Sequence, residues 1–215
     1  MKKINLLKSI SKFNRNVTLR KINKTSKVIK IAQKFDREYF DGSRKYGYGG
    51  YLYDGRWKSV VSDFINYYKL KPGDRVLDVG CAKGFLVKDF LDRRIDVYGI
   101  DISNYAIDNC HEDVVSRIKV ANAKSLPFPD KSFKLVISIN TLHNLKKSEC
   151  TTAIKEIIRV SKNHSYIQVD AYNNKEEKNF FLDWVLTAKF HTYCKNWEKY
   201  FKKINYKGEY YWTFV

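Results

Sequence analysis

One pattern constrains the fold of this chain more than any other feature. It consists of a short apolar run, a glycine turn and a second apolar run that ends on a carboxylate. The first run and its turn are VLDVGCAKG at residues 76–84, and the second run is VYGID at residues 97–101. This pattern is typical of strand, turn and helix, and second strand in an open α/β sheet, which binds ligands at the carboxyl ends of its strands. Asp101 follows Gly80 at roughly the 20-residue spacing of a carboxylate that binds ribose hydroxyls.

The turn differs from a dinucleotide-binding turn. The sequence has Ala82 where G-x-G-x-x-G requires its second glycine, and Gly84 comes one residue early. Asp78, just before the turn, would repel a pyrophosphate but suits a ligand that carries an ammonium and a sulfonium. Gly80 and Gly84 are expected to let the backbone approach the ligand closely. The pattern D-x-G-x-x-x-G with the distal Asp101 resembles the class I methyltransferases that use S-adenosylmethionine and release S-adenosylhomocysteine.

A second passage strengthens this resemblance. Residues 121–133, ANAKSLPFPDKSF, resemble the G-D-A…L-P-F-P-D-x-S-F-D passage of small-molecule methyltransferases, in which an acidic residue contacts the adenine amino group. Asn122 holds that position, and its oxygen can accept the same hydrogen bond without charge assistance. Arg56 has a planar fork suited to the methionine carboxylate. The cofactor-binding residues that the resemblance implies are Asp78, Gly80, Cys81, Gly84, Asp101, Ile102, Asn122, Ala123, Asn140 and Arg56.

The fourth expected strand ends in INTLHNL at residues 139–145. This sequence contains neither an N-P-P-Y or D-P-P-F tetrapeptide, typical of base or glutamine amino methylation, nor a Pro-Cys pair for C5-pyrimidine chemistry. Its L-H-N-L resembles the L-H-H-L of enzymes that methylate small hydroxylated or amine substrates, which implies His143 as the general base. A helix cap or a packing residue is the alternative role for this histidine.

Residues 40–57 contain five glycines and four tyrosines. Glycine hinges would let this segment close over the cofactor, while tyrosine rings would exclude water. We therefore predict a lid at residues 36–57, with Tyr46, Tyr48 and Tyr51 at the substrate. The alternative is a structured loop that covers the sheet edge.

Basic residues concentrate at the N-terminus. The chain has a net charge of +18, and residues 1–34 hold eleven Lys or Arg and no acid, so seven excess charges remain for the rest. Apolar residues recur at helical spacing in two groups, which predicts a basic helical arm at residues 1–35. These groups are Leu6, Ile10, Phe13 and Val17, then Val28, Ile31, Ala32 and Phe35, with a break between them at Asn14, Asn16, Asn23 and Thr25. Packing on its own domain or on a partner is favoured over nucleic acid or an anionic membrane surface.

The remaining pattern alternates strands and helices. Further strands are expected at residues 118–122, 134–140, 166–171, 185–192 and 210–215, with helices between them. Residues 58–215 are therefore predicted to form an α/β, Rossmann-like, seven-stranded, mostly parallel sheet sandwiched by helices. Cysteine spacing gives no metal motif and suits a reducing compartment, and no run approaches ~18 apolar residues. These features predict a cytoplasmic location with neither a metal site nor a transmembrane segment.

The sequence thus predicts a methyltransferase that acts on a hydroxyl, carboxyl or amine of a small molecule. The G-Y-G-G-Y-x-Y-D-G-R-W segment resembles a bacterial group associated with sugars and surface polysaccharides, which makes such a precursor one candidate acceptor. Three alternatives stay open: an RNA methyltransferase with a basic clamp, a non-catalytic cofactor-binding partner subunit, and use of the other sulfonium carbons. A homodimer is also compatible with the sequence.

Overall fold

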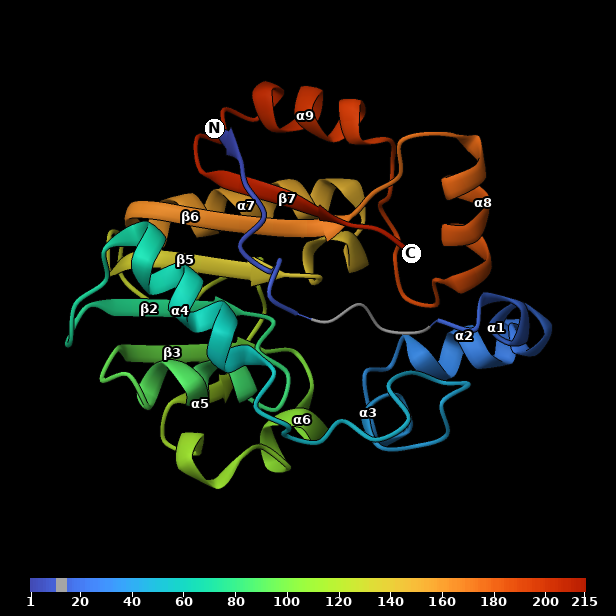
Figure 1. Cartoon of the computed structure of the whole chain (residues 1–215), viewed down its shortest axis with the longest axis horizontal. Helices are drawn as coiled ribbons and strands as arrows, with labels where there is room; N and C mark the ends of the chain where they lie inside the picture. Colours follow the sequence, from blue (N-terminus) through green and yellow to red (C-terminus); the bar gives the residue numbers. More distant parts are fainter. Residues whose placement is uncertain (11–14) are drawn as a thin grey trace.

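A computed structural model describes residues 1–10 and 15–215, and shows one seven-stranded parallel sheet (Figure 1). The strand order is β1-β7-β6-β5-β2-β3-β4, and each neighbouring pair is parallel. The strands are β1 Lys2–Lys3, β2 Arg75–Val79, β3 Asp96–Asp101, β4 Ile118–Val120, β5 Phe133–Ile139, β6 Ser161–Asp170 and β7 Glu209–Thr213. The predicted α/β fold is confirmed, with a sheet that is parallel throughout its described strands.

Helices cover both faces of this sheet. On one face, α4 (Trp57–Tyr68) and α5 (Phe85–Leu91) pack on Val76, Val97 and Leu135. The opposite face packs on two longer helices, α7 (Lys147–Val160) and α9 (Cys194–Lys203). Central strands that are apolar on both faces form because each face has its own helical layer.

Shorter helices gather beyond the carboxyl ends of the strands, where Figure 1 places α1, α2, α3 and α8. These four are α1 Val17–Asn23, α2 Ser26–Ala32, α3 Arg37–Phe40 and α8 Lys175–Trp184. The remaining short elements are α6 Asn104–Asp108 and the 3-10 turns η1 Glu112–Val114 and η2 Leu142–Asn144. The carboxyl edge of the sheet is therefore enclosed by elements from both ends of the chain.

The identity of one strand was predicted wrongly. Residues 185–192 form no strand, and the seventh strand is β1, in a segment expected to be helical. A segment with strand propensity forms a strand only where a neighbouring strand offers a pleated surface to pair with. Residues 185–192 have no such neighbour, because they pass across the carboxyl edge of the sheet. At the opposite edge, Ile4 N–H donates to Tyr210 O at 3.0 Å and extends the β1–β7 pairing. Exposed lysines on β1 suit an edge strand, since they discourage further pairing.

The described part of the arm packs on its own chain. Leu6 is buried in the core under α4, and Val28 and Ala32 of α2 pack against Leu186. The chain breaks between α1 and α2, but α1 (Val17–Asn23) lies within the segment predicted to be the break, which was too wide. Thr25 caps α2 by accepting a hydrogen bond from Val28 N–H. Phe13 and Asn14 lie outside the described residues. Among the described helices, none has the length and apolar character needed to cross a membrane.

Candidate cofactor and acceptor site

The turn after β2 places the backbone against the carboxyl edge. Gly80 has φ +88°, and a Cβ there would lie 2.0 Å from Thr141 Oγ1, so glycine is required. Gly80 lines a cavity at this edge. Gly84 does not line that cavity, and its contact with the ligand stays a prediction. Its Cβ would instead lie 2.7 Å from Val114 Cγ2, so this glycine serves helix packing.

Asp101 ends β3 and is held rigidly. One carboxylate oxygen accepts from Ala82 N–H at 2.8 Å, and the other accepts from Ser103 N–H at 2.9 Å. The side chain is largely buried, and burial raises its pKa although these backbone bonds oppose the shift. Each carboxylate oxygen has a further lone pair, so Asp101 can still accept hydrogen bonds from a ligand in the cavity that it lines.

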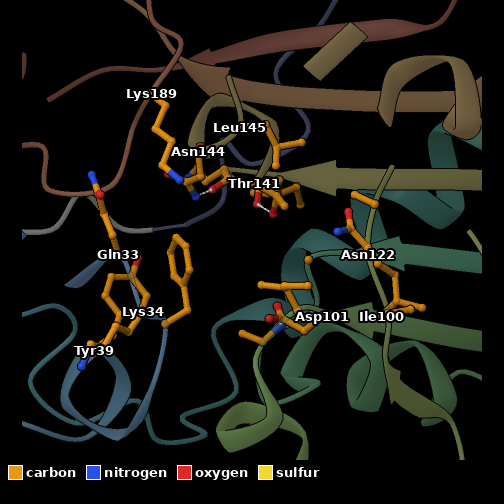
Figure 2. Close-up of a pocket in the computed structure, with 18 of the residues that line it drawn as sticks. Gln33, Lys34, Tyr39, Ile100, Asp101, Asn122, Thr141, Asn144, Leu145 and Lys189 are labelled. Carbon is orange, nitrogen blue, oxygen red and sulfur yellow. Dashed lines mark hydrogen bonds between the residues drawn. The ribbon is translucent and has the colours of Figure 1, made fainter. Parts of the chain in front are cut away.

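The first cavity has a volume of about 340 Å³, which is within the range of small-molecule sites. Figure 2 shows Gln33 and Lys34 of the arm and Tyr39 of the lid segment on one side, and Ile100, Asp101 and Asn122 on the other. Predicted residues that line it are Gly80, Asp101, Ile102, Asn122, Ala123, Asn140 and Tyr48. This cavity thus gathers most of the predicted cofactor residues.

The lining of this cavity fits a nucleoside. Ile102 is 55% exposed beside Asp101, which leaves an apolar surface that an adenine ring could cover. Oδ1 of Asn144 is buried and has no hydrogen-bond partner within residues 1–10 and 15–215. Asn122 Oδ1 accepts from Lys124 N–H at 3.0 Å and retains a second lone pair for a ligand.

Asp78 lies behind the turn in β2. Burial, and then the nearby charge of Asp101, raise the pKa of Asp78 to about 7. A bound ammonium or sulfonium would favour the ionised carboxylate and relieve this cost. The two acidic residues therefore suit a cationic ligand better than a pyrophosphate.

This pKa predicts how binding depends on pH. Below pH 7 a proton must leave Asp78 before the carboxylate attracts a cation, so the Kd for S-adenosylhomocysteine should rise about tenfold per pH unit. Isothermal titration from pH 5.5 to 8 measures this slope. In Asp78→Asn the slope should disappear, whereas Asp89→Asn, which changes a buried carboxyl on α5 away from the cavity, should keep it. A pH-independent Kd in the unmodified protein would contradict the assignment.

The raised pKa of Asp78 also predicts that the folded state becomes less stable as the pH rises, whereas cofactor binding becomes tighter. Because folding raises the pKa of Asp78, the folded state binds more protons, and stability falls as pH rises from about 4 towards 7. Free Asp78→Asn protein should therefore melt above the unmodified protein at pH 8, which also shows that the variant folds.

Seven predicted residues do not line the first cavity, namely Asp78, Gly84, Cys81, Arg56, Tyr46, Tyr51 and His143. Cys81 is buried in the core under α5, where it contacts Gly99. Arg56 pairs with Asp54 through Nε at 2.8 Å and lines a second cavity. Tyr46 packs against the small cluster that α2 forms. The ligand contacts predicted for Cys81, Arg56 and Tyr46 stay predictions.

The predicted lid is docked on the domain. The Asp41 carboxylate accepts from Tyr51 N–H at 3.1 Å, Lys83 Nζ at 2.5 Å and the Tyr105 hydroxyl at 2.7 Å. These contacts tie residues 36–57 to the turn before α5 and to α6. In this conformation the segment forms a wall of both cavities.

The second cavity, of about 490 Å³, adjoins the first. Tyr39, Tyr48 and Asn140 line both cavities. The second cavity also contains Tyr51, His143 and Asp170 among its lining residues. The two cavities therefore share part of their lining.

His143 and Asp170 form a pair at the ends of β5 and β6. His143 Nδ1 accepts from Asp170 N–H at 3.1 Å, so the ring proton is on Nε2, which lies 3.4 Å from Asp170 Oδ2. The imidazole is buried, and burial lowers its pKa more than Asp170 raises it. His143 is thus neutral at pH 7, and both of its nitrogens face Asp170.

Several lining residues were not predicted. The aromatic and polar residues of the arm reach the first cavity only through tertiary packing, which no local pattern reports. Asp170 had a readable signal, because it ends the apolar run YIQVD and polar groups at the carboxyl ends of parallel strands face the ligand crevice. The unpredicted residues with polar or aromatic contacts here are Gln33, Lys34, Tyr39, Asn144, Glu149, Asp170 and Lys189.

Comparison with known proteins agrees with this geometry. Residues 77–169 match the family described as Methyltransferase domain. A 2-methyl-6-phytyl-1,4-hydroquinone methyltransferase from Synechocystis is 28% identical over 177 residues, which are 71% of this chain and 54% of that protein. A ubiquinone/menaquinone biosynthesis C-methyltransferase from Neisseria meningitidis is 34% identical over 114 residues, covering 49% of this chain and 44% of that protein.

The fold agrees with solved structures as well. A SAM-dependent methyltransferase from Archaeoglobus fulgidus superposes with a TM-score of 0.59 at 19% identity, covering 80% of this chain and 72% of that one. The fold is therefore the Rossmann-like α/β fold of that structure. Residues 77–169 match the Methyltransferase domain family over somewhat less than half of the chain, and this match and the fold imply S-adenosylmethionine as the cofactor. The chain spans about half the length of the curated relatives it matches.

Proposed function

We propose that this chain transfers the methyl group of S-adenosylmethionine to a small molecule bound in the second cavity. The observation that carries the proposal is the shared wall formed by Tyr39, Tyr48 and Asn140 between the two cavities. A cofactor held at Asp101 in the first cavity would present its far end towards this wall. An acceptor in the second cavity would approach it from the other side.

The cofactor, when bound, supplies a methyl group already activated by its sulfonium charge. In the transfer, the bond from the acceptor oxygen or nitrogen to the methyl carbon forms as the carbon–sulfur bond breaks, and the bonding pair stays on sulfur. The chain holds the acceptor in line, which contributes up to about 7–11 kcal/mol in favourable cases. The acceptor proton must pass to a base of the protein.

Asp170 is the base in this proposal, and His143 is a positioning residue. The predicted role of His143 as base requires a free ring nitrogen, but Nδ1 accepts the backbone N–H of Asp170 and Nε2 carries the proton. Asp170 is the carboxylate of the pair, and it lines the cavity. Its second oxygen can receive the proton of a hydroxyl or ammonium group.

A hydroxyl, carboxyl or amine of a small molecule remains the proposed acceptor. Relatives named for hydroquinones, rifamycin and phosphoethanolamine support the small-molecule class without selecting one member. A sugar or surface-polysaccharide precursor, a cytoplasmic location and a homodimer stay predictions.

Mass spectrometry of a metabolite extract incubated with the protein and S-(trideuteromethyl)-labelled cofactor tests the proposal. We expect one small product to gain the label while S-adenosylhomocysteine accumulates, and Asp170→Asn protein to give little of either. Label found in RNA alone, or release of methylthioadenosine, would contradict the proposal. Cofactor binding without any labelled product would support the non-catalytic alternative instead.

A further inference from the structure

We propose that the acceptor carries a phosphate group, held in the second cavity by Arg15, Arg20 and Arg44. This inference rests on the proposed function, because it names the chemical class of the molecule methylated there. These residues, which we call the arginine cluster, come from the arm and the lid segment. They lie outside residues 77–169, which match the family.

The arginine cluster surrounds one indole ring. The guanidinium carbons of Arg20, Arg44 and Arg15 lie 4.6, 5.2 and 5.8 Å from the centre of the Trp184 ring. All four residues line the second cavity. Three guanidinium groups gathered on one ring repel one another, so the arrangement needs a compensating negative charge.

Protein groups supply too little of that charge. Within residues 1–10 and 15–215, none of the three guanidiniums pairs with a carboxylate. Arg20 donates to the carbonyls of Lys45 at 2.9 Å and Gly47 at 3.3 Å, which carry no net charge. Burial, and then the charge of Arg44, lower the pKa of Arg20 to about 10.

The charge balance of the cavity favours a dianion. Arg56, the fourth arginine on its wall, is neutralised by Asp54. Asp170 is the sole carboxylate among the described lining residues, so the arginine cluster leaves an excess of two positive charges. A phosphate monoester is close to doubly charged at neutral pH and accepts several guanidinium hydrogen bonds. A single carboxylate would compensate only half of the excess.

The position of the cluster suits an acceptor rather than the cofactor. The cluster lines the second cavity but not the first, and Tyr39, Tyr48 and Asn140 lie on the wall between them. Asp170 shares the cluster's cavity, so an anchored phosphate would hold the rest of the molecule near the base.

The affinity for inorganic phosphate is measured by ³¹P NMR titration at constant ionic strength. In a second assay, the thermal stability of the protein is compared in phosphate and in acetate, which carries a single charge. The informative variant is Arg15→Gln/Arg44→Gln, which leaves Arg20 and its two bonds to the loop in place. Arg93→Gln is the matched control, because this exposed arginine bonds Ser62 far from both cavities. We expect about a tenfold or greater loss of phosphate affinity in the double variant only.

Binding of S-adenosylhomocysteine separates this inference from the proposed function. The double variant should bind it as the unmodified protein does, which also shows that the variant folds. Phosphate that binds both proteins equally, that binds neither, or that stabilises no better than acetate would overturn the inference while cofactor binding persists. Absence of cofactor binding in the unmodified protein would instead overturn the proposed function.

Discussion

Asp101→Ala should weaken binding of S-adenosylmethionine by about a hundredfold or more. A carboxylate that accepts two ribose hydroxyls makes two charge-assisted hydrogen bonds, each worth about 1.5–3 kcal/mol. The substitution also removes the partner of the Ala82 and Ser103 amides, which shape the turn next to the cavity. Isothermal titration measures the affinity directly.

The control for this prediction is Asp108→Ala. Asp108 is an exposed carboxylate on α6, so its removal changes the net charge equally without touching the cavity. It should bind the cofactor within a factor of about two of the unmodified protein, which amounts to less than 0.5 kcal/mol. Unchanged affinity in Asp101→Ala would reject the ribose assignment.

Asp170→Asn should lower kcat by about 10²–10⁴, the range associated with loss of a general base. The amide is nearly the same size as the carboxylate but cannot take the acceptor proton at neutral pH. Affinity for S-adenosylhomocysteine should not change, because Asp170 lines the second cavity and not the first. Single-turnover transfer of the labelled methyl group to the acceptor found by mass spectrometry measures this rate.

His143→Ala separates the base from its positioning residue. It should slow transfer by less than Asp170→Asn does, because Asp170 can still receive the acceptor proton when its positioning residue is gone. The reverse outcome, with the larger loss of rate in His143→Ala, would restore His143 as the base.

Much of the fold was predictable because it depends on local patterns. The apolar runs of β2, β3 and β5 are buried on both faces, and the glycine turn needs only its own residues and the strand beside it. Asp101 and Gly80 meet for the same reason, since parallel neighbouring strands bring their carboxyl ends to one edge. The place of the proposed ribose site therefore follows from residue spacing.

The acceptor side depended on tertiary contacts that the spacing does not encode. Arg56 was expected at the methionine carboxylate, but its guanidinium pairs with Asp54, two residues earlier in the sequence. The arginine cluster forms only when the arm and the lid segment meet Trp184 at the end of α8. Such long-range contacts leave no periodic pattern in the sequence. The sequence therefore predicted a basic arm but not the cavity that its arginines line.

A crystal structure of the protein with S-adenosylhomocysteine would show where the cofactor binds. We expect the nucleoside in the first cavity, with both ribose hydroxyls on the Asp101 carboxylate and the sulfur turned towards Tyr48 and Asn140. A compound seated elsewhere, or a first cavity that stays empty at saturating concentration, would contradict this expectation.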